Sequence, residues 1–497
     1  CSIGKILSFS NNQIEKMRDT LDFSSNIFKS LLNKSSEIIL NKYNELDSQK
    51  GYHDISQKEI ESWFDEEVPI NGMPADEVLK IIKEKIYDTA TGNLGPNMYA
   101  YVMSGGNQIS VIADKLSSAI NQNVTKWHLA PALTEIDKRV IQWASEITGF
   151  GDKVGGFIGS SGSSANLDGL TVARNIFFEK QNIRTNGLFG LKPFRLYCSE
   201  ETHSSIDKSV QLLGIGSKNL KKIKINEDFT INTNALKKQI RTDIYDGFIP
   251  FCIIGNAGTV NTGAIDNLEK LSEISKENKM WFHVDGCYGG LASSLESKRN
   301  LYKGINLADS LALDFHKWLY QPFEVGCLLV KNWRIMERSY FQKASYLDKS
   351  LENENGRLDL NEHHFLLSRN AKSLKVWMSL KVYGLKRLKE MIQKDIDLTE
   401  FLKNEIKKSK DFELVSDSPL AICCFRFNGG LKNEDKILKL NEKLIPALES
   451  DGRVFITGTK LKDKLVLRAC LNNHRKNIES TKYLIKTIRE VGLSILT

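Results

Sequence analysis

The sequence has 497 residues, with 69 Lys and Arg against 61 Asp and Glu, and 41% of it is hydrophobic. This composition excludes a collagen, a largely disordered chain and a disulfide scaffold. There is no run of about 18 apolar residues and no charged start followed by an apolar core, so we expect neither a membrane span nor a secretory signal. The positive charges are spread along the chain without a basic stripe, which argues against nucleic-acid binding.

The eight cysteines are scattered, and several lie inside apolar runs such as Phe251-Cys252-Ile253-Ile254. Cysteine in such a run behaves as a small buried hydrophobe rather than as half of a disulfide. We therefore expect a reducing, cytoplasmic compartment.

The first part of the chain, 1–107, is predicted to be a helical segment. Apolar residues recur at helical spacing from Ile14 to Leu32 and from Leu79 to Ile86, and Asn71-Gly72-Met73-Pro74 interrupts the pattern. These amphipathic stretches bury little by themselves, so we expect them to pack on something else, such as a second subunit.

Residues 108–388 are predicted to form a large α/β domain with a mostly parallel, doubly wound sheet. Short apolar runs alternate with helical stretches such as Asn166–Glu179 and Leu268–Glu277, which is typical of that architecture. The predicted strands are 156–158, 195–198, 251–254, 281–284, 310–313 and 325–330, and Lys218 to Lys224 has a solvated face leading into a further strand. Ligands of such sheets bind outside the carboxyl ends of the strands.

Residues 389–497 are predicted to form a smaller α+β domain. It follows a long helix around Ser373–Tyr383, and its expected strands are Ala421–Phe427 and Leu465–Arg468. We find no internal repeat and no low-complexity tract.

The stretch Gly159-Ser160-Ser161-Gly162-Ser163-Ser164-Ala165-Asn166 follows a predicted strand and opens a helix. Small residues at a helix N-terminus let backbone N–H groups approach an anion. The stretch matches neither the dinucleotide fingerprint nor the lysine-bearing P-loop. A simple serine-capped helix start is the alternative.

Two further polar groups follow predicted strands. His203 comes shortly after one strand, where it could be a helix cap or a packed ring instead of a catalyst. Asp285 ends the buried run Trp281 to Val284, and a buried carboxylate is costly unless it is paired; a turn cap is the alternative.

Lys317 lies just beyond a third strand, in Asp314-Phe315-His316-Lys317-Trp318. A lysine beside an apolar pocket loses its charge easily and can form a Schiff base, although a surface lysine beside a core tryptophan is also consistent. An anion cradle, a stacking His203, a buried Asp285 and Lys317 together match the needs of pyridoxal 5′-phosphate, and no metal site is expected.

The order of these motifs resembles the group II pyridoxal-phosphate-dependent amino-acid decarboxylases. The resemblance rests on Ser161 to Asn166, His203, His283-Val284-Asp285 and His316-Lys317-Trp318, and it extends from about Tyr99 to Arg468, through Arg369. It implies a fold-type I homodimer whose N-terminal helical segment wraps on the partner, with the active site at the interface.

The resemblance also implies site roles. Lys317 would form the internal aldimine, His203 would stack on the pyridine ring and Asp285 would bond the ring nitrogen. The remaining implied cofactor residues are Gly162, Ser163, Ser164, Thr259, Cys287, Ser310 and His316. The implied substrate residues are Tyr101, Ser104 and Trp127. Cys287 stands where the family usually has Ala.

A second departure concerns the loop before Arg369. Many members carry a Tyr there that protonates the quinonoid, but the chain has no Tyr from Leu347 to Arg369. His363 or His364 could supply the proton, or both could be exposed loop residues. We therefore expect a decarboxylase that converts an L-amino acid to its amine, with an aldehyde synthase or a C–C lyase of the same fold as alternatives and a non-catalytic binding protein as the alternative of another class.

Overall fold

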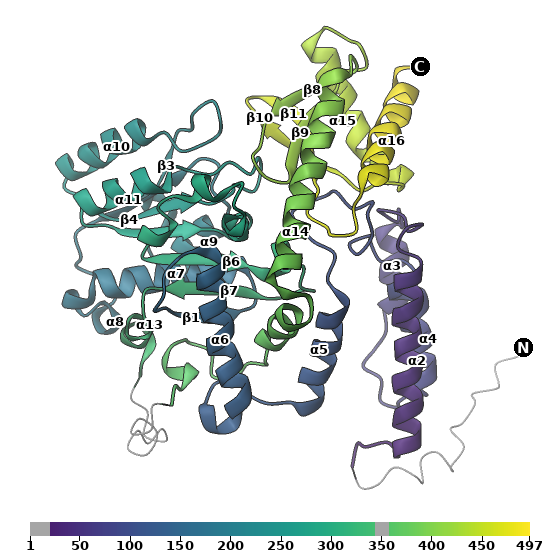
Figure 1. The fold of residues 1–497 in the computed structure, drawn as a ribbon, viewed down its shortest axis with the longest axis horizontal. Helices are drawn as coiled ribbons and strands as arrows, with labels where there is room; N and C mark the ends of the chain where they lie inside the picture. The colour runs from purple at the N-terminus through teal and green to yellow at the C-terminus, as the bar shows by residue number, and fades with distance from the viewer. Residues whose placement is uncertain (1–19, 343–356) are drawn as a thin grey trace, which may run out of the picture.

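The computed structural model describes residues 20–342 and 357–497. A large seven-stranded sheet occupies one side of the molecule, and a smaller four-stranded sheet lies beside it (Figure 1). The strands of the large sheet are β1 (Gly155–Gly159), β2 (Phe194–Ser199), β3 (Leu220–Ile223), β4 (Ile249–Asn256), β5 (Trp281–Asp285), β6 (Ser310–Asp314) and β7 (Gly326–Val330).

The large sheet has the order β1-β7-β6-β5-β4-β2-β3. Strand β7 is antiparallel to both of its neighbours, and the pairs among β6, β5, β4, β2 and β3 are all parallel. The expectation of a mostly parallel α/β sheet is confirmed. The carboxyl ends of the parallel strands consequently meet at one edge, where the polar motifs begin.

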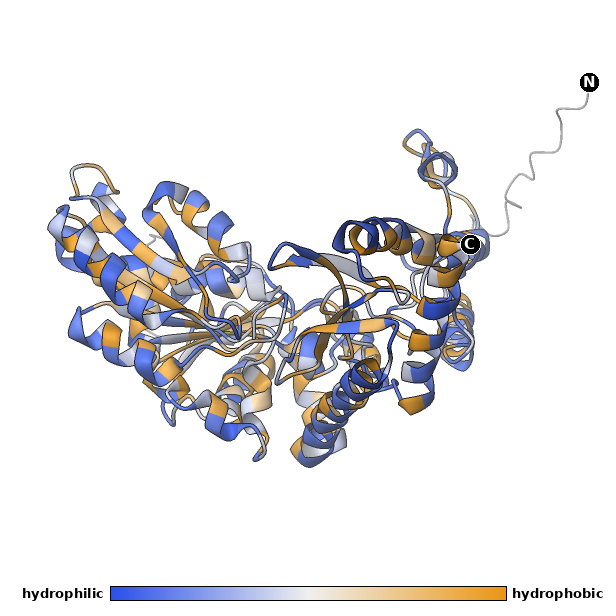
Figure 2. Cartoon of the chain, turned by 90° about the horizontal axis from the view of Figure 1, so that it is seen from above, coloured by the Kyte–Doolittle hydropathy of each residue, from blue (hydrophilic) through white to orange (hydrophobic). Residues whose placement is uncertain are grey.

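Helices cover both faces of this sheet (Figure 1). They are α6 (Pro131–Thr148), α7 (Gly162–Phe177), α8 (Ile183–Asn186), α9 (Ser205–Leu212), α10 (Thr233–Tyr245), α11 (Leu268–Glu277), α12 (Phe315–Trp318) and α13 (Trp333–Tyr340). Successive strand side chains enter opposite cores: Phe157 and Leu328 pack in a core with α7 and α9, whereas Ile158 and Leu329 pack in a core with α6 and α11. Hydrophobic residues accordingly follow the strands and the inner helix faces (Figure 2).

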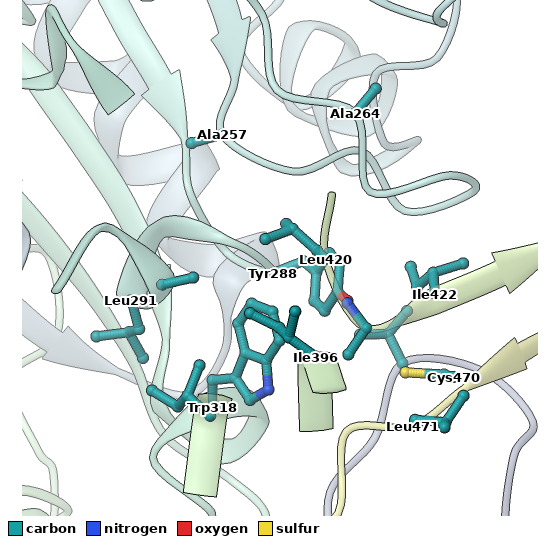
Figure 3. Close-up of a cluster of buried hydrophobic side chains, with 14 of the residues drawn as sticks. Ala257, Ala264, Tyr288, Leu291, Trp318, Ile396, Leu420, Ile422, Cys470 and Leu471 are labelled. Atoms are coloured by element: carbon teal, nitrogen blue, oxygen red, sulfur yellow. The ribbon is translucent and has the colours of Figure 1, made fainter. Parts of the chain in front are cut away.

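The small sheet has the order β10-β11-β9-β8 and is antiparallel throughout. Its elements are α14 (Ser373–Lys408), β8 (Phe412–Ser416), β9 (Ile422–Phe427), α15 (Glu434–Asp451), β10 (Thr457–Leu461), β11 (Lys464–Cys470) and α16 (Ile478–Leu496). The long helix α14 is interrupted at Gly384, which has a φ of 72°. Its second half carries Ile396 against Trp318 and Tyr288, so one apolar cluster joins the two sheets (Figure 3).

The N-terminal helices stand at the edge of the molecule, away from the large sheet (Figure 1). They are α2 (Ser25–Asn44), α3 (Gln57–Phe64) and α4 (Ala75–Ile81) with a π-helical continuation (Ile82–Tyr87); the next helix, α5 (Gln108–Ile120), packs on α14. No residue of α2, α3 or α4 is buried, and Phe28, Leu40 and Ile60 expose their side chains. The helical prediction is confirmed for these residues, whereas Ile14 and its neighbours up to residue 19 lie outside the described residues.

Candidate active site

Lys317 lies at the carboxyl edge of the large sheet, on the short helix α12 that follows β6. Its side chain is 16% exposed and opens into a pocket. The residues that line this pocket are Gly162, Ser163, Asn166, His203, Ser205, Asn256, Gly258, Thr259, Val260, Asp285, Cys287, Tyr288, Asp314 and Lys317. His203, Asp285 and Lys317 therefore meet in one cavity with the helix start at Gly162.

The charge of Lys317 depends on its carboxylate neighbours. Lys317 Nζ lies 3.4 Å from Asp314 Oδ2. Burial alone lowers the pKa of Lys317, but the carboxylates of Asp314 and Asp285 outweigh burial and raise it. The amine is therefore held as a cation paired with Asp314.

Asp285 is fixed at the end of β5 by two hydrogen bonds. Its Oδ1 accepts the backbone N–H of Cys287 at 3.1 Å, and its Oδ2 accepts Nδ2 of Asn166 at 3.0 Å. These donors hold the carboxylate in one orientation, and the side chain is almost fully buried. The carboxylate is thus available for one cationic N–H inside the pocket.

His203 is held as a neutral ring of known tautomer. The backbone N–H of Ser205 donates to His203 Nδ1 at 3.1 Å, so this nitrogen carries no hydrogen and the ring hydrogen is on Nε2. Burial lowers the pKa of His203, more than Asp285 raises it. A neutral, flat ring therefore faces the pocket beside Asp285.

The N-terminus of α7 supplies an anion site. Ser161 and Ser164 form a reciprocal capping box, which leaves the N–H groups of Gly162 and Ser163 without helical acceptors. A Cβ on Gly162 would lie 2.5 Å from Cys287 Sγ and 2.9 Å from Asp314 Oδ2, so only glycine leaves this corner open. Burial raises the pKa of the Cys287 thiol well above its usual range, so Cys287 is a neutral filler of the pocket wall.

Several predicted cofactor residues lie outside the pocket lining. Ser164 Oγ is used in the capping box. Ser310 begins β6, at the end of the strand opposite Lys317, and contacts Trp281 and His283 instead of the anion site. The His316 ring turns away toward Asp314, at 2.8 Å between Nδ1 and Oδ1, without the alignment of a hydrogen bond.

The predicted substrate residues also lie outside this lining. Ser104 donates to the backbone carbonyl of His316 at 2.6 Å, so it braces α12. Tyr101 is exposed and packs edge-on against Phe455, and Trp127 donates to Glu135. Within the described part of one chain, none of the three lines the cavity that holds Lys317.

The two candidate proton donors of the loop are buried, which excludes the alternative that both are exposed loop residues. His363 Nδ1 lies 2.8 Å from the carbonyl of Asp359, and His364 is stacked on Phe157. Neither ring lines the pocket of its own chain. The Tyr-less stretch from Leu347 to residue 356 lies outside the described residues.

Sequence reasoning gave no role to several residues that the fold brings into the pocket. Asn166 and Asp314 stood inside the quoted motifs, and their positions one helical turn from Gly162 and Lys317 were the available signal. Ser205, Asn256 and Tyr288 come from other loops and strand ends, and no local pattern singles them out.

Comparisons with known proteins decide the family. The family model described as "Pyridoxal-dependent decarboxylase conserved domain" matches residues 58–428. An aromatic-L-amino-acid decarboxylase of Bacillus atrophaeus is 33% identical over 477 residues, covering 96% of this chain and 98% of the relative. The chain belongs to the pyridoxal-dependent decarboxylases.

Other relatives define the range of this family. A phenylacetaldehyde synthase of Arabidopsis thaliana is 28% identical over 429 residues, covering 85% of this chain and 86% of the relative. The crystal structure of Oryza sativa TDC with PLP and tryptamine has the same fold, with a TM-score of 0.91, 22% identity and coverage of 97% of this chain and 100% of that one. The decarboxylase is thus a pyridoxal-phosphate-dependent carboxy-lyase.

The pocket of this decarboxylase fits pyridoxal 5′-phosphate. The open corner at Gly162 and the free N–H groups of α7 suit a phosphate, and the oriented carboxylate of Asp285 suits a protonated ring nitrogen. Lys317 is the amine that reaches into the same cavity. The family and the donor set of the pocket therefore agree on the cofactor.

Proposed function

We propose that this decarboxylase converts an aromatic L-amino acid to its amine and carbon dioxide, with Lys317, Asp285 and His203 at the reacting centre. The observation that carries the proposal is the convergence of these three side chains on one pocket beside the α7 N-terminus. The aromatic substrate class is supported by the 33% identical relative, whose name is aromatic-L-amino-acid decarboxylase.

Asp285 would keep the pyridine nitrogen protonated. When bound, pyridoxal 5′-phosphate withdraws the electron pair left on the α-carbon as carbon dioxide departs. A carboxylate held by Cys287 N–H and Asn166 Nδ2 can accept a third hydrogen bond from the ring nitrogen without moving. The N–H groups of Gly162 and Ser163 would hold the phosphate.

Lys317 would hold the cofactor through its Nζ and release it to the incoming substrate amine. Asp314 Oδ2, 3.4 Å from Lys317 Nζ, would stabilise the released amine as the ammonium. His203, a neutral ring with hydrogen on Nε2, would pack on the cofactor face, where its Nε2–H can donate a hydrogen bond.

Arg468 offers a site for the substrate carboxylate. Its Nη1 donates to the carbonyl of Val260, a residue of the pocket wall, at 2.9 Å. In the described part of the chain Arg468 Nε is buried without a hydrogen-bond partner. A guanidinium with a spare donor is the usual partner of a carboxylate.

A homodimer in the cytoplasm completes the proposal. Apolar side chains such as Phe28, Leu40, Ile112 and Leu116 are exposed on α2 and α5, and a second copy would cover them. The seven cysteines of the described residues are free and buried, which favours a reducing compartment. Among the described residues, no helix is long and apolar enough to cross a bilayer.

The test is mass spectrometry of the products after the loaded protein is incubated in air with a pool of amino acids. We expect an aromatic amine and carbon dioxide from the wild type, and neither from Lys317→Ala at equal protein and cofactor. An aldehyde with ammonia and peroxide would replace the proposal by the aldehyde synthase, which the Tyr-less loop keeps as the second candidate. An unchanged aromatic fraction would refute the substrate class.

A further inference from the structure

A continuous chain of buried hydrogen bonds runs behind the pocket from Trp281 to Asp285. Trp281 Nε1 donates to Ser310 Oγ at 2.9 Å, and Ser310 Oγ lies 2.8 Å from His283 Nδ1. His283 Nε2 lies 2.9 Å from Asn166 Oδ1. Asn166 Nδ2 then donates to Asp285 Oδ2 at 3.0 Å and to Ser205 Oγ at 3.0 Å.

The two ends of this chain fix its direction. The indole N–H of Trp281 can only donate, so the hydroxyl hydrogen of Ser310 is free for His283 Nδ1. The ionised carboxylate of Asp285 can only accept, so Asn166 must present its NH₂ to Asp285 and its carbonyl oxygen to His283. Both requirements are met only when His283 is neutral with its hydrogen on Nε2.

Burial reinforces this arrangement. His283 and Ser310 are fully buried and Asn166 is nearly so, which leaves no water to replace a missing partner. Burial lowers the pKa of His283 to about 4, although Asp285 opposes the shift. A Cβ on Gly169 would lie 2.6 Å from His283 Cε1, so α7 packs directly on the ring and leaves it little room to turn.

We propose that Ser310 and His283 are positioning residues: Ser310 donates to His283 Nδ1, and His283 Nε2–H holds the oxygen of Asn166, so that the Asn166 amide donates to Asp285 and, through Ser205, supports His203. Ser310 is thus assigned a place behind the ring-nitrogen site instead of at the phosphate. The inference rests on the proposed role of Asp285 toward the cofactor ring.

Loss of the Ser310 hydroxyl has a defined consequence. It leaves the lone pair of His283 Nδ1 buried without a donor and the indole N–H of Trp281 without an acceptor. The hydrogen stays on Nε2, because Asp285 still requires the NH₂ of Asn166 and Asn166 Oδ1 still requires a hydrogen from His283. The ring is then held from one side only, so the ring-nitrogen site is less firmly oriented although no pocket residue has changed.

The experiment measures the tautomer of His283 by ¹⁵N NMR of the full-length, ¹⁵N-histidine-labelled protein, with the signal assigned by loss in His283→Gln. The dissociation constant of pyridoxal 5′-phosphate is measured on the same samples from the absorption of the lysine-bound cofactor. The variants are Ser310→Ala, Ser310→Thr, which keeps a hydroxyl, and Ser272→Ala. Ser272 is a matched control because its hydroxyl is also fully buried and has no hydrogen-bond partner in the described residues.

We expect hydrogen on Nε2 of His283 in the wild type and in Ser272→Ala. In Ser310→Ala we expect the hydrogen to stay on Nε2, the ¹⁵N signal of Nδ1 to move because its hydrogen bond is lost, and cofactor binding to weaken by roughly 10-fold, as one lost buried hydrogen bond of about 1.4 kcal/mol implies. Ser310→Thr should restore the Nδ1 signal and the cofactor affinity. A wild-type ring with hydrogen on Nδ1, or a Ser310→Ala protein with an unchanged Nδ1 signal and unchanged binding, would overturn the proposed positioning role.

The test of Ser310 and His283 can be told apart from a failure of the proposed function. The tautomer is measured before and after cofactor is added, so it does not depend on activity. If the wild type fails to bind pyridoxal 5′-phosphate at Lys317, the proposed function fails whatever the tautomer is. If the wild type binds the cofactor normally and Ser310→Ala changes neither the His283 signal nor the affinity, only the positioning role of Ser310 and His283 is refuted.

Discussion

Lys317 Nζ lies 3.4 Å from Asp314 Oδ2, three positions earlier on the chain. The pair sits where β6 passes into α12, so the strand end holds the carboxylate and the first helical turn holds the amine. Burial lowers the pKa of Lys317, and Asp314 is the largest influence that raises it. The charge of the Lys317 amine is therefore determined within the four residues from Asp314 to Lys317.

Replacing this carboxylate gives the first prediction. In Asp314→Asn the pKa of Lys317 falls, so the neutral amine needed to attack the cofactor aldehyde is present at lower pH. The rate at which cofactor-free protein captures pyridoxal 5′-phosphate should then rise with pH at a more acidic position than in the wild type. Stopped-flow absorption across a pH series measures it, and Asp309→Asn, at the other end of β6, is the control. A profile that stays in place or moves to alkaline pH would contradict the role of Asp314.

The second prediction concerns the corner of the pocket at Gly162. In Gly162→Ala the new Cβ meets Cys287 Sγ at 2.5 Å, and the wall on that side is fixed by β5. We expect cofactor affinity to fall at least ~10-fold, or about 1.4 kcal/mol. Adding Cys287→Ala removes the sulfur and should recover part of the loss, whereas Gly151→Ala, with only Val154 Cγ1 at 3.9 Å, should change nothing. Equal losses with and without Cys287→Ala would show that the sulfur is not the obstacle.

The strands of the large sheet were predictable because they are short apolar runs between turn residues. Strand β3 (Leu220–Ile223) was anticipated only as the continuation of a charged stretch, since its two central residues are lysines. Strands β8 and β10 were not predicted. Both lie at the edges of the small sheet, where half-exposed residues replace the apolar run that marks a central strand.

The site was predictable to the extent that its chemistry sits on local motifs. Lys317, Asp285, His203 and Gly162 each follow a strand, and a parallel sheet brings such positions together. The resemblance placed Ser310 at the phosphate, whereas in the structure it lies outside the pocket lining, because its distance from Lys317 depends on the length of β6 and not on any motif. The contact of Asp395 with Trp318 joins positions 77 apart, and no sequence pattern encodes it.

The third prediction uses that contact. Asp395 Oδ2 accepts Trp318 Nε1 at 3.1 Å and Tyr320 OH at 2.7 Å, which fastens both ends of the turn after Lys317. Trp318 stacks on Tyr288 of the pocket wall (Figure 3). Burial raises the pKa of Asp395 from 3.8 to about 7, although Tyr320, Trp318 and the cations Lys476 and Lys394 all oppose the shift.

The sign of the pH effect follows from the proton count. Between 3.8 and about 7 the folded protein holds a proton on Asp395 that the unfolded chain has released, so this group makes stability fall as pH rises through that window. Asp395→Asn should remove this contribution. The difference in unfolding free energy between variant and wild type should therefore change with pH only between 3.8 and about 7. Urea unfolding at a series of pH values measures it, with Asp243→Asn as a control carboxylate that also accepts a tyrosine hydroxyl. A pH-independent difference would mean that Asp395 does not titrate in this range.

The last prediction separates structure from catalysis at His364. The N–H of Leu366 donates to His364 Nδ1 at 3.1 Å, so the ring hydrogen is on Nε2, which lies 2.9 Å from Asp168 Oδ2. Both ring nitrogens are therefore occupied, and the ring is stacked on Phe157 at 3.3 Å between centroids. A ring held in this way has no free proton to pass to a substrate.

We expect His364→Gln to lower the unfolding free energy by about 1–3 kcal/mol, because it leaves the buried Asp168 with a poorer partner. The ratio of amine to aldehyde among the products should stay at the wild-type value. Thermal unfolding and product mass spectrometry on the same preparation measure the two quantities. Asp168→Asn should also lower the unfolding free energy without altering the ratio of amine to aldehyde. A rise in aldehyde and peroxide specific to His364→Gln would instead identify this ring as the proton source in an enzyme whose loop lacks the Tyr.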